Sequence, residues 1–241
     1  MPAFLCFTLY APLAAFGDVA VGERRHSLER PGCSAVLGLI AAALGIERRD
    51  QAALDRLTGS LLVAVHGLRS GTLLEDFHTA QVPAARRGAR PATRREELAA
   101  PKLGTILSRR DYRQEPWHEV ALLVRDEAGP APATIAAALQ APGFVLHHGR
   151  KCCPLGLPPE PRLLEEADLG AAFLAYARQG AARRLLPYRP RPGTLHADLA
   201  LRPLLGAAWR IERILERRDL PLDRRRWQFG LRRELVAVPA A

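Results

Sequence analysis

The spacing of hydrophobic positions predicts strands and helices in alternation over the first third of the chain. Ala3 to Tyr10 alternates and is rich in Phe and Leu, as a buried strand does. The apolar run over residues 34–45 is too long for a strand, and its closing glycine favours a helix. Asp50 is an N-cap candidate for a second helix. Leu61 to Arg69 predicts another strand, and Leu73 to Val82 could pair back on it.

The middle of the chain continues this pattern after a break. Residues 83–102 hold Pro, Ala, Gly and several arginines with little periodicity, which predicts a loop. Thr105 to Tyr112 resumes an extended pattern, so a long hairpin with a basic tip is expected. The pattern then predicts a strand over His118 to Arg125, a helix over Pro132 to Ala141 and a strand over Phe144 to His148.

The order of these elements predicts an α+β fold. Strand, helix, strand, hairpin insertion, strand, helix and strand make the split βαβ of a ferredoxin-like, RRM-like domain with a βαββαβ order. We expect an antiparallel sheet with helices on one face and the other face free for a ligand. This domain is placed at residues 1–153, with the hairpin at about 78–117. The proline-rich stretch 154–161 marks a boundary, and residues 162–241 form a small, β-rich, arginine-rich C-terminal unit.

Positive charge is concentrated in two segments. The chain has a formal net charge of +10. Residues 86–113 carry nine basic and three acidic side chains, and residues 178–241 carry fifteen and six, whereas the rest of the chain is slightly acidic. A genome bias toward arginine accounts for the near absence of lysine, but not for the uneven placement. The distribution indicates a binding surface for a polyanion.

The apolar stretches and the cysteines predict a cytoplasmic protein without a membrane span. The longest apolar run, residues 35–46, is shorter than the roughly 18 residues that a spanning helix needs. The four cysteines, Cys6, Cys33, Cys152 and Cys153, do not match a disulfide framework or a CxxC metal pair. We therefore expect no metal and no cofactor.

Two segments near the ends of predicted elements are candidates to contact a phosphate. Gly32 and Ser34 lie where the first long helix begins, and free amides and the helix dipole at such an end favour an anion. An ordinary helix cap explains Ser34 equally well. Gly149 releases the chain into a turn after the last predicted strand, and Arg150 and Lys151 on that turn are suited to clamp a sugar-phosphate backbone.

Further candidates surround the predicted hairpin. One group lies in the loop after the first strand, and others lie at the root, the tip and the close of the hairpin. Alternation sends Phe77 and Thr79 to one face and Asp76 and His78 to the other, with Phe77 expected in the core. The candidate RNA contacts are Arg24, Arg25, His26, His78, Thr79, Lys102, Arg109, Arg110 and Tyr112, together with the arginines from Arg86 to Arg95.

Five motifs in order make the chain similar to a known family. They are APLAAFGD, PGCSAVLGLIAAALGI, GTLLEDFHTA, TILSRRDY and GRKCCPLGLP, within about residues 3–160. They resemble the Cas-five family of RAMP proteins of type I-E CRISPR Cascade, which hold the 5′ handle of the crRNA. The family commonly has Pro-Ser/Thr-Lys-Ser where this chain has Pro31-Gly32-Cys33-Ser34, so a lysine contact is lost.

The resemblance implies a fold, a set of partners and a role. It implies a RAMP body with a protruding thumb hairpin, bound to the crRNA 5′ handle beside the Cascade backbone subunit and the large PAM-reading subunit. Target DNA is then a partner only through the complex. It also implies a non-catalytic subunit in antiviral defence, because another subunit processes the crRNA in type I-E systems.

Two other classes remain open from the residues themselves. A metal-independent endoribonuclease that processes pre-crRNA needs a base, a proton donor and a cation, for which His26, Tyr112 and Lys151 are the candidates. An RNA-binding protein unrelated to CRISPR explains the charge but not the ordered motifs.

Overall fold

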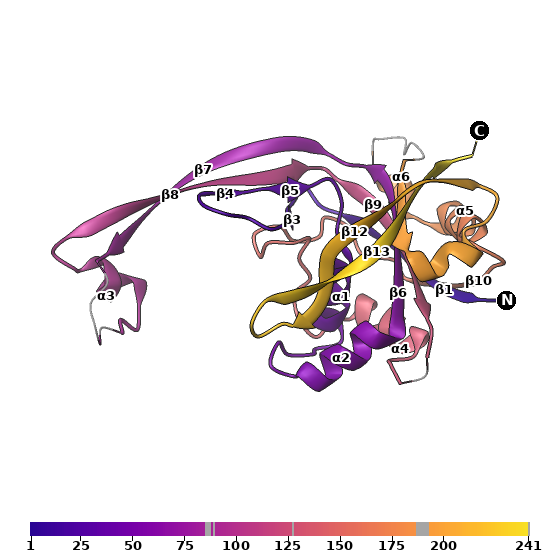
Figure 1. The fold of residues 1–241 in the computed structure, drawn as a ribbon, viewed down its shortest axis with the longest axis horizontal. Coiled ribbons are helices and arrows are strands. Elements are labelled where there is room, and N and C mark those ends of the chain that lie inside the picture. The colour runs from indigo at the N-terminus through magenta and orange to yellow at the C-terminus, as the bar shows by residue number, and fades with distance from the viewer. Residues whose placement is uncertain (85–87, 89, 127, 187–192, 241) are drawn as a thin grey trace.

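A seven-stranded antiparallel sheet forms the centre of the molecule. The computed structural model describes residues 1–84, 88, 90–126, 128–186 and 193–240. The strand order is β10-β1-β9-β6-β11-β13-β12 (Figure 1). The strands are β1 (Ala3–Tyr10), β6 (Leu61–Arg69), β9 (Trp117–Val124), β10 (Arg162–Glu165), β11 (Leu195–Asp198), β12 (Trp209–Asp223) and β13 (Gln228–Pro239).

Apolar side chains cover both faces of this sheet. Alternate residues of β1 enter two separate cores, Leu5 and Phe7 on one side and Phe4 and Cys6 on the other. The first core contains α1 (Cys33–Ala43), α2 (Gln51–Ser60) and α4 (Pro132–Gln140). The second contains α5 (Leu169–Gln179) and η1 (Leu199–Leu204), and α6 (Ala182–Leu185) follows α5. The expectation of a sheet face free for a ligand is therefore wrong, because the C-terminal part of the chain covers it.

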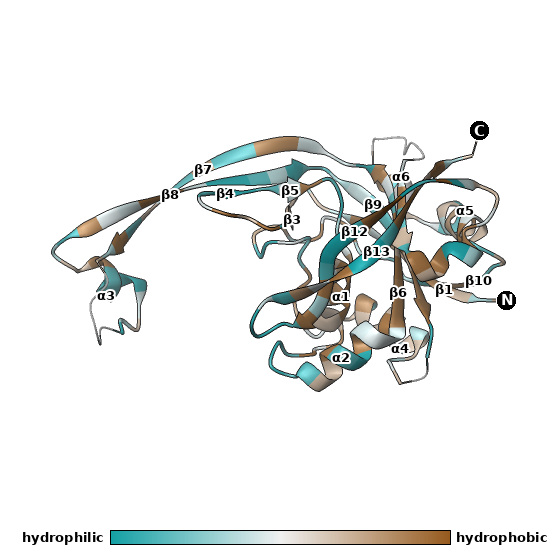
Figure 2. Cartoon of the chain, viewed as in Figure 1, coloured by the Kyte–Doolittle hydropathy of each residue, from teal (hydrophilic) through white to brown (hydrophobic). Residues whose placement is uncertain are grey.

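The sequence signals for the first strand and the second helix are confirmed. β1 spans the predicted residues, and six of its eight side chains are buried. Asp50 caps α2, since its Oδ1 accepts a hydrogen bond of 3.0 Å from the amide of Ala53. Among the described helices, none is long and apolar enough to cross a membrane. Figure 2 shows the contrast between the hydrophobic β6 inside the body and the hydrophilic β4 at its surface.

The strand predicted at Phe144 to His148 is not present, and only an isolated bridge joins His147 to Pro154. The amides of Gly143 and Phe144 instead donate to the carbonyls of Ala43 and Ala42 at the end of α1. The edge of the sheet next to β1 is occupied by β10, where Leu164 lies opposite Phe4. The chain therefore returns to the sheet after the proline-rich segment, not before it.

The residues predicted as a separate C-terminal unit extend the same sheet. β11 pairs with β6, where Ala197 lies opposite Ala64, and β13 pairs with β11. β12 and β13 form a long hairpin at the far edge. The proline-rich stretch 154–161 thus lies in the connection between α4 and β10, and the strands before and after that connection belong to one sheet.

A long hairpin projects from the body (Figure 1). It consists of β7 (Thr72–Pro83) and β8 (Leu103–Gln114), paired from Thr72 opposite Gln114 to Pro83 opposite Leu103. β7 therefore pairs with β8, in agreement with the expected hairpin, and does not pair with β6, the other pairing that the sequence suggested. The outer loop contains a short helix, α3 (Arg94–Leu98), where a loop was predicted. Thr93 Oγ1 accepts from the Glu96 amide, and Glu96 Oε2 accepts from the Ala92 amide.

Four short strands of the N-terminal loop lie against the base of this hairpin or against each other. They are β2 (Leu13–Ala14), β3 (Phe16–Gly17), β4 (Arg24–Arg25) and β5 (Ser27–Leu28). β2 and β4 pair with β8, and β3 pairs with β5. The loop after β1 is thereby fixed beside the root of the hairpin.

Candidate nucleic-acid interface

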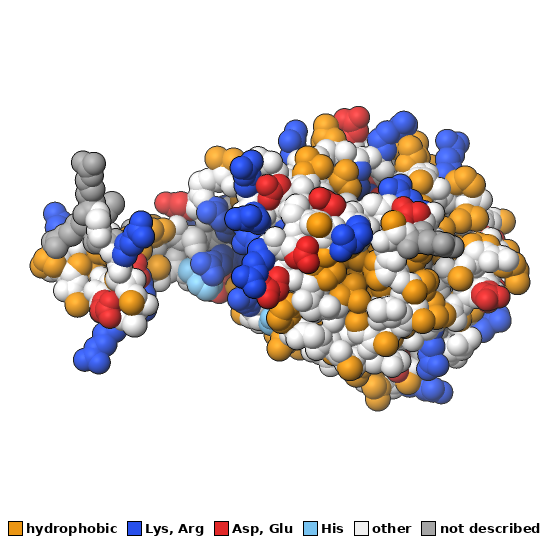
Figure 3. All heavy atoms as spheres, turned by 90° about the horizontal axis from the view of Figure 1, so that it is seen from below, with side chains coloured by type: hydrophobic (Ala, Val, Ile, Leu, Met, Phe, Trp, Pro, Cys, Tyr) orange, Lys and Arg blue, Asp and Glu red, His pale blue; other side chains and the backbone are white. Residues whose placement is uncertain are grey.

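Arginines from two distant segments meet at the base of the hairpin. β4 runs parallel to β8, with Arg24 opposite Arg109 and Arg25 opposite Arg110. Figure 3 shows Lys and Arg side chains in a band where the hairpin joins the body. The sequence identified these four arginines as candidates, and the strand pairing brings them together.

The buried carboxylate of Asp111 contacts side chains of this cluster. Its side chain is 4% exposed, and its Oδ2 lies 3.5 Å from Arg24 and 3.2 Å from Nδ1 of His26. Arg24 also pairs with Glu75 at 2.8 Å, and Arg109 approaches the same carboxylate at 3.7 Å. A buried carboxylate of this kind fixes the direction of the cations that contact it. Sequence reasoning missed Asp111, because a single acid between arginines gives no signal of burial.

Arg150 joins the cluster from the turn after the expected last strand. Its guanidinium donates to the carbonyls of Asp111, at 3.1 Å, and Arg25, at 3.2 Å. Its Cζ also lies 4.6 Å from the ring centroid of Tyr112. We define the neck as Arg24, Arg25, Arg109, Arg110 and Arg150. Within the described residues, these arginines pair with two carboxylates, those of Glu75 and Asp111, so positive charge is in excess on this surface.

Gly149 lets this turn approach the N-terminal loop. Its φ is +100°, and a Cβ at this position would lie 1.9 Å from the carbonyl oxygen of Ala15. The amide of Ala15 donates to the carbonyl of His148 at 3.1 Å. A side chain at residue 149 would therefore push the turn away from the neck. The sequence interpretation of Gly149 as a residue with positive φ is confirmed.

The start of α1 is occupied by a carboxylate of the protein itself. Asp219 Oδ2 accepts a hydrogen bond of 2.9 Å from the amide of Cys33, and a Cβ at Gly32 would lie 2.6 Å from the same oxygen. This amide is therefore not open to a phosphate, in contrast to the expectation for Gly32. Ser34 lies beside a cavity, and its carbonyl accepts from Arg224 at 2.6 Å.

Asp219 belongs to a buried ionic network that attaches the C-terminal hairpin to the body. Arg232 contacts Asp219 at 2.6 and 3.0 Å and also pairs with Asp198 and Glu234. Glu234 pairs in addition with Arg30. Burial by itself raises the pKa of Glu234, but hydrogen bonding to His196 and the charges of Arg30 and Arg232 lower it to about 2.

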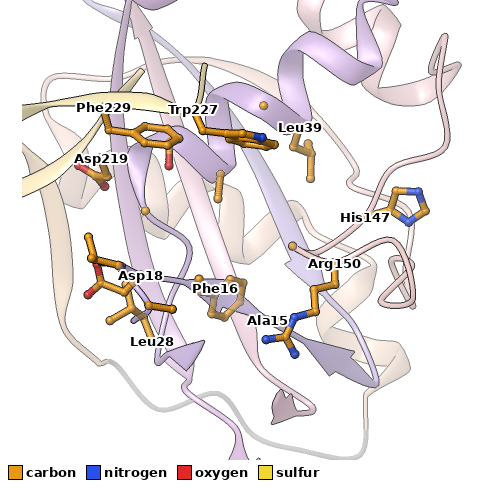
Figure 4. A pocket seen from close by; sticks show the side chains of 18 of the residues that line it. Ala15, Phe16, Asp18, Leu28, Leu39, His147, Arg150, Asp219, Trp227 and Phe229 are labelled. Carbon is orange, nitrogen blue, oxygen red and sulfur yellow. The ribbon is translucent and has the colours of Figure 1, made fainter. Parts of the chain in front are cut away.

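A cavity of about 820 Å³ lies between the start of α1, the loop at residues 15–20, the Gly149 turn and the C-terminal hairpin. Figure 4 shows Trp227 and Phe229 along one side of it, with Phe16 and Arg150 across from them. Gly32 and Ser34 also line it. The cavity therefore connects the helix start with the turn that carries Arg150.

The remaining candidates are not among the five arginines of the neck. His78 pairs with Asp76 on β7, and Thr79 lies opposite Leu107. Phe77 is 57% exposed, so its expected place in the core is wrong, because the hairpin has no layer packed over it at this point. Lys102, at the outer end of the hairpin, and Lys151, on the Gly149 turn, are exposed.

The outer basic segment is only partly described. Arg86 and Arg87 lie outside the described residues. Arg94 pairs with Glu97 and contacts the carbonyl of Gln81, so it holds α3 against β7. Part of this charge therefore stabilises the tip of the hairpin.

The candidates for acid–base chemistry have different contacts. His26 contacts Asp111, while the hydroxyl of the buried Tyr112 lies 3.8 Å from the Sγ of Cys152. Lys151 is exposed on the neighbouring turn. Within the described residues, no group of three His, Cys, Asp or Glu side chains is arranged to hold a metal ion.

Three comparisons with known proteins agree on the family of the chain. A family model described as CRISPR-associated protein (Cas_Cas5) matches residues 4–234. The CRISPR system Cascade subunit CasD of Escherichia coli (strain K12) is 29% identical over 188 residues, which cover 75% of this chain and 80% of that protein.

Two solved structures share the fold over almost the whole chain. A chain of a CRISPR RNA-guided surveillance complex is 25% identical, with a TM-score of 0.61 over 98% of this chain and 91% of that one. A Cas protein crystal structure is 22% identical, with a TM-score of 0.60 over 98% and 95% of the two chains.

Proposed function

Because the chain belongs to the Cas_Cas5 family of CRISPR-associated proteins, we propose that it is a non-catalytic subunit of a Cascade surveillance complex that binds the 5′ handle of the crRNA. The Escherichia coli relative is a Cascade subunit, which supports this assignment. The family resemblance of the five motifs supports the handle as the RNA segment bound.

The topology supports the ferredoxin-like interpretation of the body. β1, α1, β6, β9, α4 and β10 follow one another in the order βαββαβ, apart from α2 and the hairpin insertion, and their strands lie in the order β10-β1-β9-β6. The β7–β8 hairpin then corresponds to the thumb of a RAMP protein. The C-terminal residues 162–241 complete the sheet and add the β12–β13 hairpin beside the cavity.

The neck is the observation that carries the proposal. Five arginines from three separate segments converge there, and Arg109 keeps a side chain that is 58% exposed. Single-stranded RNA offers a phosphate at every nucleotide, and arginine binds phosphate with two parallel hydrogen bonds. An RNA that crosses the neck therefore contacts the loop after β1, the hairpin root and the Gly149 turn together.

The outer hairpin supports the proposed protein partners. Phe77, Ile106 and Leu107 are 57%, 53% and 39% exposed along its two strands. Apolar side chains on a projecting element suit contact with another subunit. We assign this surface to the neighbouring backbone subunit, and the body to contact with the large subunit, so that target DNA is reached only through the complex.

Co-purification tests the proposed function. The chain is expressed with a tag in a cell that contains a type I-E CRISPR locus, and the RNA that remains bound is sequenced from its 5′ end. We expect one population of RNAs that begin with the same repeat-derived sequence. A mixture of cellular RNAs without a shared 5′ end would contradict the proposal.

A further inference from the structure

The turn between β12 and β13 exposes aromatic and basic side chains that the neck does not use. Its sequence is Arg224-Arg225-Arg226-Trp227-Gln228-Phe229. Trp227 is 59% exposed and has a φ of +53°, in the left-handed region that bulky residues rarely adopt. Both exposure of an indole and this backbone conformation are unfavourable in isolation, so contacts around the turn must hold it.

The contacts that hold the turn come from Arg48 of the body and from Asp223 at the end of β12. Arg48 donates to the carbonyls of Arg224 and Arg225 at 2.6 and 3.1 Å. The Oδ1 of Asp223 accepts from the amides of Arg225 and Arg226 at 2.8 and 3.0 Å. The guanidinium of Arg48 also lies 4.2 Å from the ring centroid of Trp227. The indole is therefore fixed by a cation on one side while much of its surface stays open.

Trp227 and Phe229 together form a wall of the cavity. Their ring centroids are 6.2 Å apart and their planes differ by 32°, so a base does not fit between the two rings. The two rings instead form one aromatic surface on which a base can stack. Figure 4 shows both rings along the same edge of the cavity. At about 820 Å³, the cavity lies within the about 300–1,000 Å³ typical of ligand sites.

Basic groups surround this aromatic wall. Arg217 and Arg218 line the same cavity, and neither forms an ion pair with any residue in the described part of the chain. Arg150 of the neck borders it as well. The same cavity is therefore lined by the aromatic surface of Trp227 and Phe229 and by the guanidinium groups of Arg217 and Arg218.

We propose that Trp227 and Phe229 stack on a splayed base of single-stranded RNA whose phosphates bind Arg217 and Arg218. The inference rests on the proposed function and adds a second contact for the same RNA. Aromatic side chains beside cations are the usual means of binding single strands, because every base has a π face. The charge favours RNA over a protein partner, since three consecutive arginines precede Trp227 and, within the described residues, Arg226 alone of the three forms an ion pair, with Asp223.

Tryptophan fluorescence tests this contact directly. Trp227 is exposed, whereas Trp117 is 1% exposed and Trp209 is partly buried against His66. A short single-stranded oligoribonucleotide with the repeat-derived 5′ sequence is titrated into the full chain. We expect quenching of the emission on binding, and loss of that quenching together with about tenfold weaker binding in Trp227→Leu. Trp227→Phe should restore most of the affinity.

The controls separate stacking from a general loss of apolar surface. Leu231→Ala removes another exposed apolar side chain of the same hairpin, 56% exposed, and should bind like the unmodified protein. Thermal unfolding of each variant verifies the fold, and Trp227→Phe keeps the test valid if Trp227→Leu unfolds. The unmodified protein should bind an oligonucleotide with abasic sites more weakly than the intact oligonucleotide. Trp227→Leu should bind the two oligonucleotides with equal affinity.

Each result bears on a separate claim. RNA that binds without quenching, and with equal affinity to Trp227→Leu, would overturn the stacking contact and leave the proposed function intact. A Trp227→Leu variant that binds RNA normally but fails to assemble with partner subunits would overturn it in favour of a protein surface. Absence of RNA binding by the unmodified protein would contradict the proposed function itself.

Discussion

Arg150 stacks on Tyr112, with its guanidinium carbon 4.6 Å from the ring centroid. This contact joins the Gly149 turn to β8 at the root of the hairpin. Because the same guanidinium donates to two backbone carbonyls, Arg150 has both a structural and an electrostatic role in the neck. The neighbouring Lys151 is exposed and supplies charge alone.

The two residues should therefore respond differently to substitution. Lys151→Ala is expected to lower the slope of log affinity for RNA against log salt by about 0.7, one phosphate contact, without a change in stability. Arg150→Ala should lower the slope similarly and also reduce the free energy of unfolding by about 1 kcal/mol, because two hydrogen bonds are lost. Salt titrations and chemical denaturation measure both effects. Equal stability of the two variants would show that Arg150 does not hold the turn.

Asp219 should stabilise the fold, because its carboxylate occupies the start of α1, where a phosphate of RNA was expected. Asp219→Ala removes a partner of the buried Arg232 and the acceptor for the Cys33 amide, so we expect a loss of about 3 kcal/mol in the free energy of unfolding. Asp18→Ala removes an exposed acid near the same cavity and should change it by less than about 0.5 kcal/mol. Similar denaturation midpoints for the two variants would contradict the assigned role.

Acid should destabilise the protein through a buried imidazole. Burial lowers the pKa of His118 to about 3 from its ordinary value of 6.5, and a hydrogen bond to the Glu29 carbonyl opposes this shift only in part. The unfolded chain binds a proton below about pH 6.5 while the folded protein does not, so this stability is complete above pH 6.5 and falls as the pH decreases toward 3.

The free energy of unfolding at pH 7.5 and pH 5 measures this loss. It should decrease by up to about 1.4 kcal/mol per pH unit for one such group below pH 6.5. His118→Gln should show a smaller decrease over the same interval. Equal decreases in the two proteins would show that His118 takes up its proton in the folded state.

The purified chain should leave repeat RNA intact. His26 contacts Asp111 and the hydroxyl of Tyr112 contacts Cys152, so each of the two groups that would transfer a proton is engaged with another side chain. Incubation with repeat RNA in the presence of a chelator, followed by gel electrophoresis, should give full-length RNA. Cleavage at one site that disappears in His26→Ala would assign the chain to the pre-crRNA endoribonucleases.

The fold was predictable where local pattern and tertiary packing agree. The alternation of Ala3 to Tyr10 and the cap at Asp50 gave correct elements, because each uses a signal within a few residues. Phe144 to His148 also has a strand-like pattern, but the amides of Gly143 and Phe144 donate to carbonyls at the end of α1. The spacing of Thr93 and Glu96 is typical of the start of a helix. The surrounding Pro and Gly residues favoured the prediction of a loop instead.

The site was predictable in its basic residues and not in its acidic ones. Arg109 and Arg150 stand out in charged clusters, whereas Asp111 and Asp219 resemble ordinary solubilising acids in the sequence. Their roles depend on strand pairing and burial, which connect residues as far apart as Cys33 and Asp219. Trp227 lacked a signal for the same reason, since its partner Arg48 lies on a different element.

The salt dependence of RNA binding by a neck variant tests the central claim most directly. The double variant Arg109→Ala/Arg110→Ala is compared with Arg178→Ala/Arg202→Ala, which removes the same charge from exposed positions distant in sequence from the neck. Between about 50 and 200 mM salt, we expect the neck variant to lose about 1.4 from the slope, two phosphate contacts at about 0.7 each, and the control to keep the slope of the unmodified protein. Equal slopes for all three proteins would contradict the neck as the seat of the RNA.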